Sequence, residues 1–91
     1  MTEEDYTAVM ARGTAAAALL ADETFQQALD AVRADALETF EQLAPGSVGL
    51  MQTQHAKLLA VEDVRAKLRA WSDAATKTAF DTEKRSRIAN R

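Results

Sequence analysis

The sequence lacks cysteine and has only one proline, three glycines and one histidine in 91 residues. Without cysteine no disulfide can stabilise the fold, and a chain this short buries only about 60 to 65% of the surface that its unfolded form exposes. Small helical folds with so little core often gain stability by self-association. The sequence therefore predicts one small domain that forms a homo-oligomer, and the absence of cysteine suits a reducing, cytoplasmic compartment.

Long apolar runs are also missing. The most apolar stretch, residues 15–21, is mostly alanine and is far shorter than the roughly 20 residues of a membrane span. The acidic first residues do not resemble the basic start of a secretory leader. We therefore expect no membrane partner.

Residues that carry chemistry are equally scarce. His55 is the only histidine, and a metal site or an acid-base pair needs further positioned groups. No serine lies in a glycine-flanked nucleophile turn, and the glycines form neither phosphate-binding pattern. The sequence predicts no catalytic, cofactor-binding or metal residues, no small-molecule substrate and no enzymatic activity, with His55 as a structural residue near a helix seam.

What remains is rich in helix-forming residues, and no cluster of valine or isoleucine favours a strand. Pro45 and Gly46 mark the clearest turn. The predicted fold is all-α: an antiparallel helical hairpin of residues 23–43 and 48–80, with a shorter N-terminal helix, residues 3–20, folded across it. Residues 1–80 form one helical domain, and residues 81–91 form a basic tail that is expected to be disordered because Ile88 is nearly its only apolar residue.

Polar residues mark the predicted helix starts. Thr2 and Asp5 have the spacing of a capping box, with aspartate in place of the usual glutamate. Asp22 and Ser47 are suited to cap the second and third helices.

Each predicted helix has an apolar stripe at three- and four-residue spacing. Gly13 lies within the first stripe, so either a break or a close helix crossing is expected there. The three stripes are Tyr6, Val9, Met10, Gly13, Ala17 and Leu20; Phe25, Ala28, Leu29, Val32, Ala36, Leu37, Phe40 and Leu43; and Met51, His55, Leu58, Val61, Val64, Leu68, Trp71, Ala75 and Phe80.

The third helix also shows seven-residue steps, which favour coiled-coil-like packing. A helix of 30 residues measures about 45 Å and its partner about 30 Å, so the third helix must extend beyond the second. Trp71 and Phe80 lie on this overhang and either pack under the N-terminal helix or anchor a subunit interface. The predicted protein interface is Met51, Leu58, Val61, Val64, Leu68, Trp71 and Phe80.

Charge is unevenly distributed, although the net charge is only −3. Residues 1–45 carry nine acids and two bases, whereas residues 46–91 carry five acids and nine bases. This asymmetry favours pairing of the two halves, contact between copies, or an acidic partner for the basic end, while mixed, solvated charges are the commonest alternative. The residues predicted to contact nucleic acid non-specifically through phosphates are Arg65, Lys67, Arg69, Lys77, Lys84, Arg85, Arg87 and Arg91.

Several helix residues carry a resemblance to known proteins: Arg12-Gly13, Leu19-Leu20, Asp22, Phe25 and Ala28, then Leu58-Leu59, Val64 and Leu68. Over roughly residues 10–75 the chain resembles short helical proteins of tailed bacteriophages from head and DNA-packaging gene modules. The resemblance implies a non-enzymatic head-assembly or packaging factor in the host cytoplasm or the virion, such as a small-terminase-like ring subunit with capsid or packaging proteins and DNA as partners.

The residues themselves leave a second hypothesis open. The polar face of the second helix carries Asp30, Asp35, Glu38 and Glu41. A small phage protein with such a face would act as an inhibitor or adaptor that binds a host complex.

Overall fold

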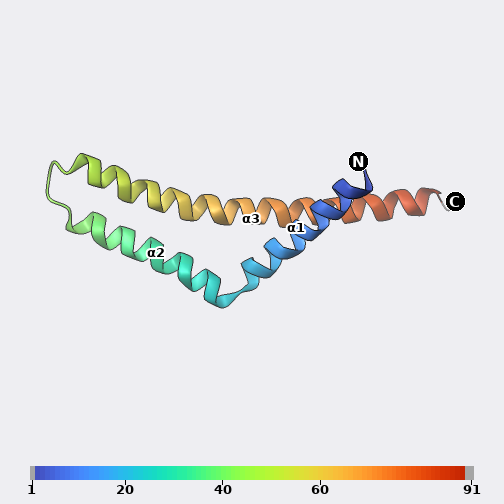
Figure 1. The fold of residues 1–91 in the computed structure, drawn as a ribbon, viewed down its shortest axis with the longest axis horizontal. Helices are drawn as coiled ribbons and strands as arrows, with labels where there is room; N and C mark the ends of the chain where they lie inside the picture. Colours follow the sequence, from blue (N-terminus) through green and yellow to red (C-terminus); the bar gives the residue numbers. More distant parts are fainter. Residues whose placement is uncertain (1, 90–91) are drawn as a thin grey trace.

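The computed structural model describes residues 2–89, which form three α-helices (Figure 1). The helices are α1, Glu3–Ala21; α2, Glu23–Gln42; and α3, Val48–Ala89. The prediction of an all-α fold is confirmed. The molecule is elongated, with principal extents of 69 × 25 × 19 Å.

The arrangement of the helices follows from the length of α3. With 42 residues α3 is about 63 Å long, whereas the 20 residues of α2 cover about 30 Å. α2 returns along the first half of α3, and α1 packs on the second half, so α1 and α2 follow one another along the same helix (Figure 1). The predicted placement of α1 across the hairpin is therefore wrong. α1, with 19 residues, is shorter than α2 by only one residue.

The helix boundaries depend on the predicted local signals. The Thr2 hydroxyl accepts the N–H of Asp5, and the Asp5 carboxylate accepts the N–H of Thr2, which confirms the capping box. Asp22 ends α1 and caps α2, because its carboxylate accepts the N–H of Phe25 at 2.7 Å. Gly46 has a φ of +91°, which the turn requires and glycine adopts without strain. Ser47 precedes α3, and its backbone carbonyl accepts the N–H of Met51.

The seam of α3 has a seven-residue period. Gln54, Val61, Leu68 and Ala75 are buried at successive seven-residue steps. Met51, Leu58, Arg65, Ser72 and Ala79 form a second series with the same spacing, and all five are half-buried. The two series together form the a and d positions of a heptad pattern, so coiled-coil-like packing is confirmed for α3 within the chain.

Three residues predicted for this apolar face lie away from it. His55, Val64 and Phe80 are exposed. The reason is that the seam accepts polar residues, Gln54 and Arg65, at positions where hydrophobicity predicted none. The stripe predicted from hydrophobicity alone therefore included residues on neighbouring faces of the helix.

Close contact between α1 and α3 depends on Gly13. A β-carbon at Gly13 would lie 2.1 Å from the Ala75 Cβ and 2.8 Å from the Trp71 carbonyl oxygen. Gly13 therefore allows a close helix crossing, and α1 continues through it without a break. Ala16, rather than the predicted Ala17, is the other buried residue of α1.

The apolar face of α2 is only partly covered. Ala36 is buried, and Phe25, Leu29 and Leu43 are half-buried. The remaining members of the predicted stripe are exposed: Ala28, Val32, Leu37 and Phe40. One packed helix therefore does not cover the full width of this face.

The C-terminal segment differs from the prediction. Residues 81–89 are the last turns of α3, so neither the expected helix end near residue 80 nor disorder applies to them. The Arg87 guanidinium bonds Glu83 one turn earlier, which supports a helix whose side chains bury nothing. Residues 90 and 91 lie outside the described part.

None of the helices between residues 2 and 89 has the length and apolar character needed to span a bilayer.

Candidate functional site

Much of the predicted protein interface lies inside the chain. Val61 and Leu68 are buried in the α3 seam, and Met51, Leu58 and Trp71 are half-buried. Only Val64 and Phe80 are exposed, at 42% and 64%. The seam that sequence patterning assigned to another subunit is thus largely occupied by α1 and α2.

Trp71 packs under α1, as one of the two alternatives predicted. The Arg12 guanidinium lies over the indole ring, 4.9 Å from its centroid. A cation over an aromatic face is attracted by the electron-rich ring, and it limits the access of water to the ring. Phe80, for which the same position was predicted, is instead exposed beyond this contact.

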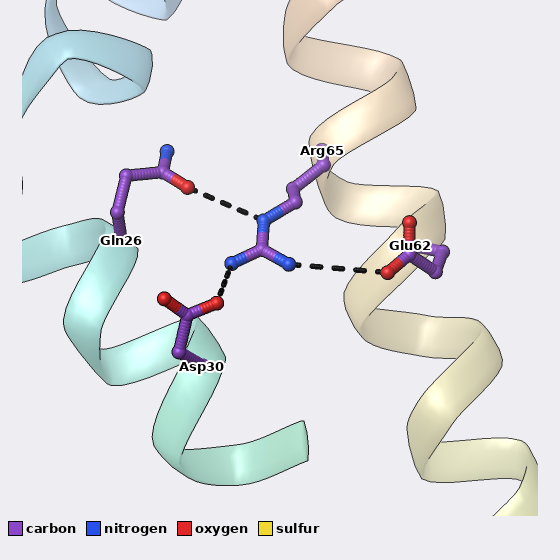
Figure 2. A network of polar contacts seen from close by, with 4 residues as sticks. All are labelled: Gln26, Asp30, Glu62 and Arg65. Carbon is purple, nitrogen blue, oxygen red and sulfur yellow. Dashed lines mark hydrogen bonds and ion pairs between the residues drawn. The ribbon is translucent and has the colours of Figure 1, made fainter. Parts of the chain in front are cut away.

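Arg65 forms the main polar link between α2 and α3 (Figure 2). Its Nη2 donates to Asp30 Oδ1 at 2.5 Å and its Nε donates to Gln26 Oε1 at 3.2 Å. A longer ion pair of 3.9 Å joins Nη1 to Glu62 on α3 itself. The Arg65 side chain is 13% exposed, so the stem of this long residue fills the seam while its head bridges the helices.

Two predicted roles change with this network. Arg65 belongs to the predicted nucleic-acid set, yet it is held by α2. Asp30 belongs to the predicted acidic face, yet it is the partner of Arg65. Pairing of the acidic and basic halves of the chain was one of the predicted alternatives. The Arg65–Asp30 ion pair is one such contact between α2 and α3.

The other predicted nucleic-acid contacts do not share one surface. Lys77 and Lys84 lie seven residues apart on one face of α3, while Lys67, Arg69 and Arg85 lie on other faces. Arg87 bonds Glu83, and Arg91 lies outside the described residues. Acidic residues lie between these bases, so the described part of α3 has a mixed surface with a basic cluster near its C-terminal end.

The acidic face of α2 keeps three of its predicted members exposed. Asp35, Glu38 and Glu41 are exposed, and in the described part of the chain they make no ion pair. Glu38 and Glu41 lie on the side of α2 away from the buried Ala36, and Asp35 borders a depression that α2 shares with α3. Their negative charge is therefore accessible to a basic partner.

Shallow depressions flank the hairpin on one side. One is lined by Val32, Asp35, Ala36, Thr39, Gln54 and Lys57, from both α2 and α3. A second is formed by Asp63, Val64, Lys67, Leu68 and Trp71 of α3. Both are open surface hollows of about 330 and 290 Å³. They are wide enough to receive side chains from another helix.

Residues that could hold a metal ion do not gather among residues 2–89. His55 is exposed near the start of α3, off the seam where it was expected. A depression between the start of α1 and the end of α3, lined by Thr2, Glu3, Tyr6, Thr78, Asp81, Thr82 and Arg85, is open to solvent.

The position of Arg65 on the seam could have been predicted from the sequence by seven-residue spacing, although not by hydrophobicity. Arg65 lies seven residues after Leu58 and fourteen after Met51, both recognised as seam residues. Extending that register would have placed Arg65 on the seam. Its partner Asp30 carried no such signal, because the pairing depends on how α2 and α3 align.

Comparisons with known proteins found no family model, no curated protein and no solved structure that matches this chain.

Proposed function

We propose that this chain is a non-enzymatic helical subunit that acts by assembling with other protein chains. The observation that carries the proposal is the imbalance between exposed and buried apolar residues. Among the described residues, ten large apolar residues are exposed, from Leu37 at 36% to Phe80 at 64%, whereas no large side chain is fully buried. Exposed apolar surface of this extent favours association with another macromolecule.

The head-assembly or DNA-packaging role implied by the phage resemblance is the form of this proposal that we favour. It places the protein in a host cytoplasm or a virion, as a small-terminase-like subunit or a partner of capsid or packaging proteins. The rod-like shape, with exposed apolar residues on both α2 and α3, suits a subunit that contacts neighbours along its length. Such a subunit is expected to form a closed assembly rather than an open aggregate.

The test is the mass of the purified chain in solution by size-exclusion chromatography with light scattering. A defined multiple of 9.9 kDa is expected across a range of concentrations. The proposed role would be contradicted if the chain remained monomeric up to several hundred micromolar and bound no DNA at low salt.

DNA contact is a part of the favoured role that rests on the basic end of α3. Lys77 and Lys84 share one helix face, and Arg85 lies beside it. Phosphate contacts of this kind weaken steeply with salt because counterions are released on binding. Fluorescence anisotropy with duplex DNA should show affinity at 25 mM salt that is lost by 200 mM, and Lys77→Glu with Lys84→Glu should remove it. The single substitution Arg33→Glu on α2 changes the net charge as much as either lysine substitution alone, and it should leave the affinity nearly unchanged.

The second candidate is an inhibitor or adaptor that binds a basic host protein, and the exposed acids of α2 favour it. Asp35, Glu38 and Glu41 are accessible, whereas Asp30 is engaged by Arg65. Reversing these three acids while keeping Asp30 tests the face without disturbing the hairpin. Loss of a specific captured host protein would support the acidic face as the binding surface, and unchanged capture would reject it.

A further inference from the structure

Next to the seam, one face of α3 carries a further series of residues at seven-residue spacing that the other helices cover only in part. Leu50, Lys57, Val64 and Trp71 follow one another at seven-residue intervals, and we call these four residues the outer stripe. Leu50 and Val64 are exposed, while Trp71 is half-buried beneath Arg12. A helix with apolar residues at three positions of its heptad has room for two packing partners at each level, whereas α2 and α1 follow one another along α3 and supply only one at a time.

α2 contributes to the same surface. Val32 of α2 and Lys57 of the outer stripe line one depression, and Val64 and Trp71 line the other. Val32 and three of the four outer-stripe residues therefore line these two depressions, which together we call the groove. The groove ends at Trp71, where Arg12 of α1 covers the indole ring.

The surface area of the chain indicates how much of it another molecule would have to cover. A compact protein of 9.9 kDa exposes about 5,200 Å². This chain exposes 6852 Å². The difference, about 1,600 Å², is roughly twice the 800 Å² that each partner buries in a standard interface. The groove therefore lies on a molecule with enough unburied surface for a stable dimer.

We propose that a second copy of this chain docks in the groove, so that two α2–α3 hairpins form an antiparallel four-helix bundle. This inference rests on the proposed assembly function and assigns its interface. A two-fold axis along the groove places α2 of one copy over α3 of the other, in opposite directions. Val32 of each copy then faces the outer stripe of the other, which buries apolar residues from both copies.

Charge complementarity selects a second copy as the occupant. Asp35 and Lys57 line the same depression, at the same height along the hairpin, and the described structure has no ion pair between them. The two-fold axis brings Asp35 of each copy to Lys57 of the other, so that two opposite-charge contacts form at once. A self-complementary surface of this kind is what a symmetric dimer requires.

The test uses the full 91-residue chain in sedimentation equilibrium, with circular dichroism to check helicity. The wild type should have twice the mass of one chain. Val64→Lys places a charge in the groove and should raise the dimer dissociation constant at least tenfold. Leu59→Lys is the matched control: Leu59 is 51% exposed on the same helix, about 140° away around the axis, and should dimerise as the wild type does.

Charge-reversal variants test whether the molecule that docks in the groove is a second copy of this chain. Lys57→Glu should weaken the dimer severalfold, and adding Asp35→Lys should restore it, because the reversed pair again faces its opposite. If Val64→Lys leaves a wild-type oligomer intact, the groove is not its interface and this inference is overturned, while the assembly function stands. A wild type that stays monomeric at several hundred micromolar overturns the dimer and removes the main support for assembly as well.

Discussion

At the scale of single residues, Gly13 decides how closely α1 approaches α3. Replacing it with alanine adds a methyl group that overlaps Ala75 in a packed crossing, and overpacking of this kind costs about 1 to 3 kcal/mol. Alanine returns about 1 kcal/mol in a helix interior, so the fold should be destabilised by up to about 2 kcal/mol. Urea unfolding followed by circular dichroism measures the difference.

Gly49 offers a matched control for that substitution. It also lies in a helix, but a β-carbon there meets nothing within 4 Å. Gly49→Ala should leave the unfolding midpoint unchanged or raise it. Equal stability of the two variants would show that α1 does not cross α3 as closely as described.

Arg65 is the second residue whose substitution should change the stability of the fold. Arg65→Ala should cost about 1 to 3 kcal/mol, because it removes the stem that fills the seam and leaves Gln26 without its donor. Asp30→Ala should cost less than about 1 kcal/mol, because the Asp30 side chain is 68% exposed and water replaces much of the ion pair. Chemical denaturation of both variants gives the comparison, and a larger effect at Asp30 would contradict it.

At the scale of elements, Asp22 joins α1 to α2 and caps the second helix. Asp22→Ala should lower stability by about 1 kcal/mol, because the N–H of Phe25 loses its side-chain acceptor. Asp22→Asn keeps an acceptor oxygen at the same position and serves as the control. Thermal melts of the two variants should differ by a few degrees, and coincident melts would indicate that the cap contributes nothing.

Element boundaries were predictable where they depend on local chemistry. The capping box at Thr2, the cap at Asp22 and the turn at Gly46 are all confirmed, because each is decided by residues within one turn of helix. The end of α3 was not predictable from apolar spacing, since residues 81–89 remain helical without burying side chains. Apolar periodicity reports which face of a helix is covered, not how far the helix extends.

At the scale of the whole molecule, the proposed dimer couples stability to protein concentration. Mass action stabilises an assembled form as its concentration rises. A tenfold increase should raise the melting temperature by about 3 to 6 °C, given the enthalpy expected for a dimer of this size. Val64→Lys should abolish the dependence. A wild-type melting temperature that is independent of concentration would count against self-association.

The sequence by itself determined the presence of three helices, the caps at Thr2 and Asp22 and the reversal at Pro45-Gly46, because propensity, capping and turn chemistry act between neighbouring residues. Part of the candidate surface, Val64 and Phe80, was also predicted from the sequence. Only the tertiary structure decided which helix faces are covered: α1 lies beyond α2 instead of across it, Arg65 bridges to Asp30, and the outer stripe stays open. These outcomes depend on the relative alignment of three rods of unequal length, and that alignment is set by long-range packing at sites such as Gly13 and Ala75.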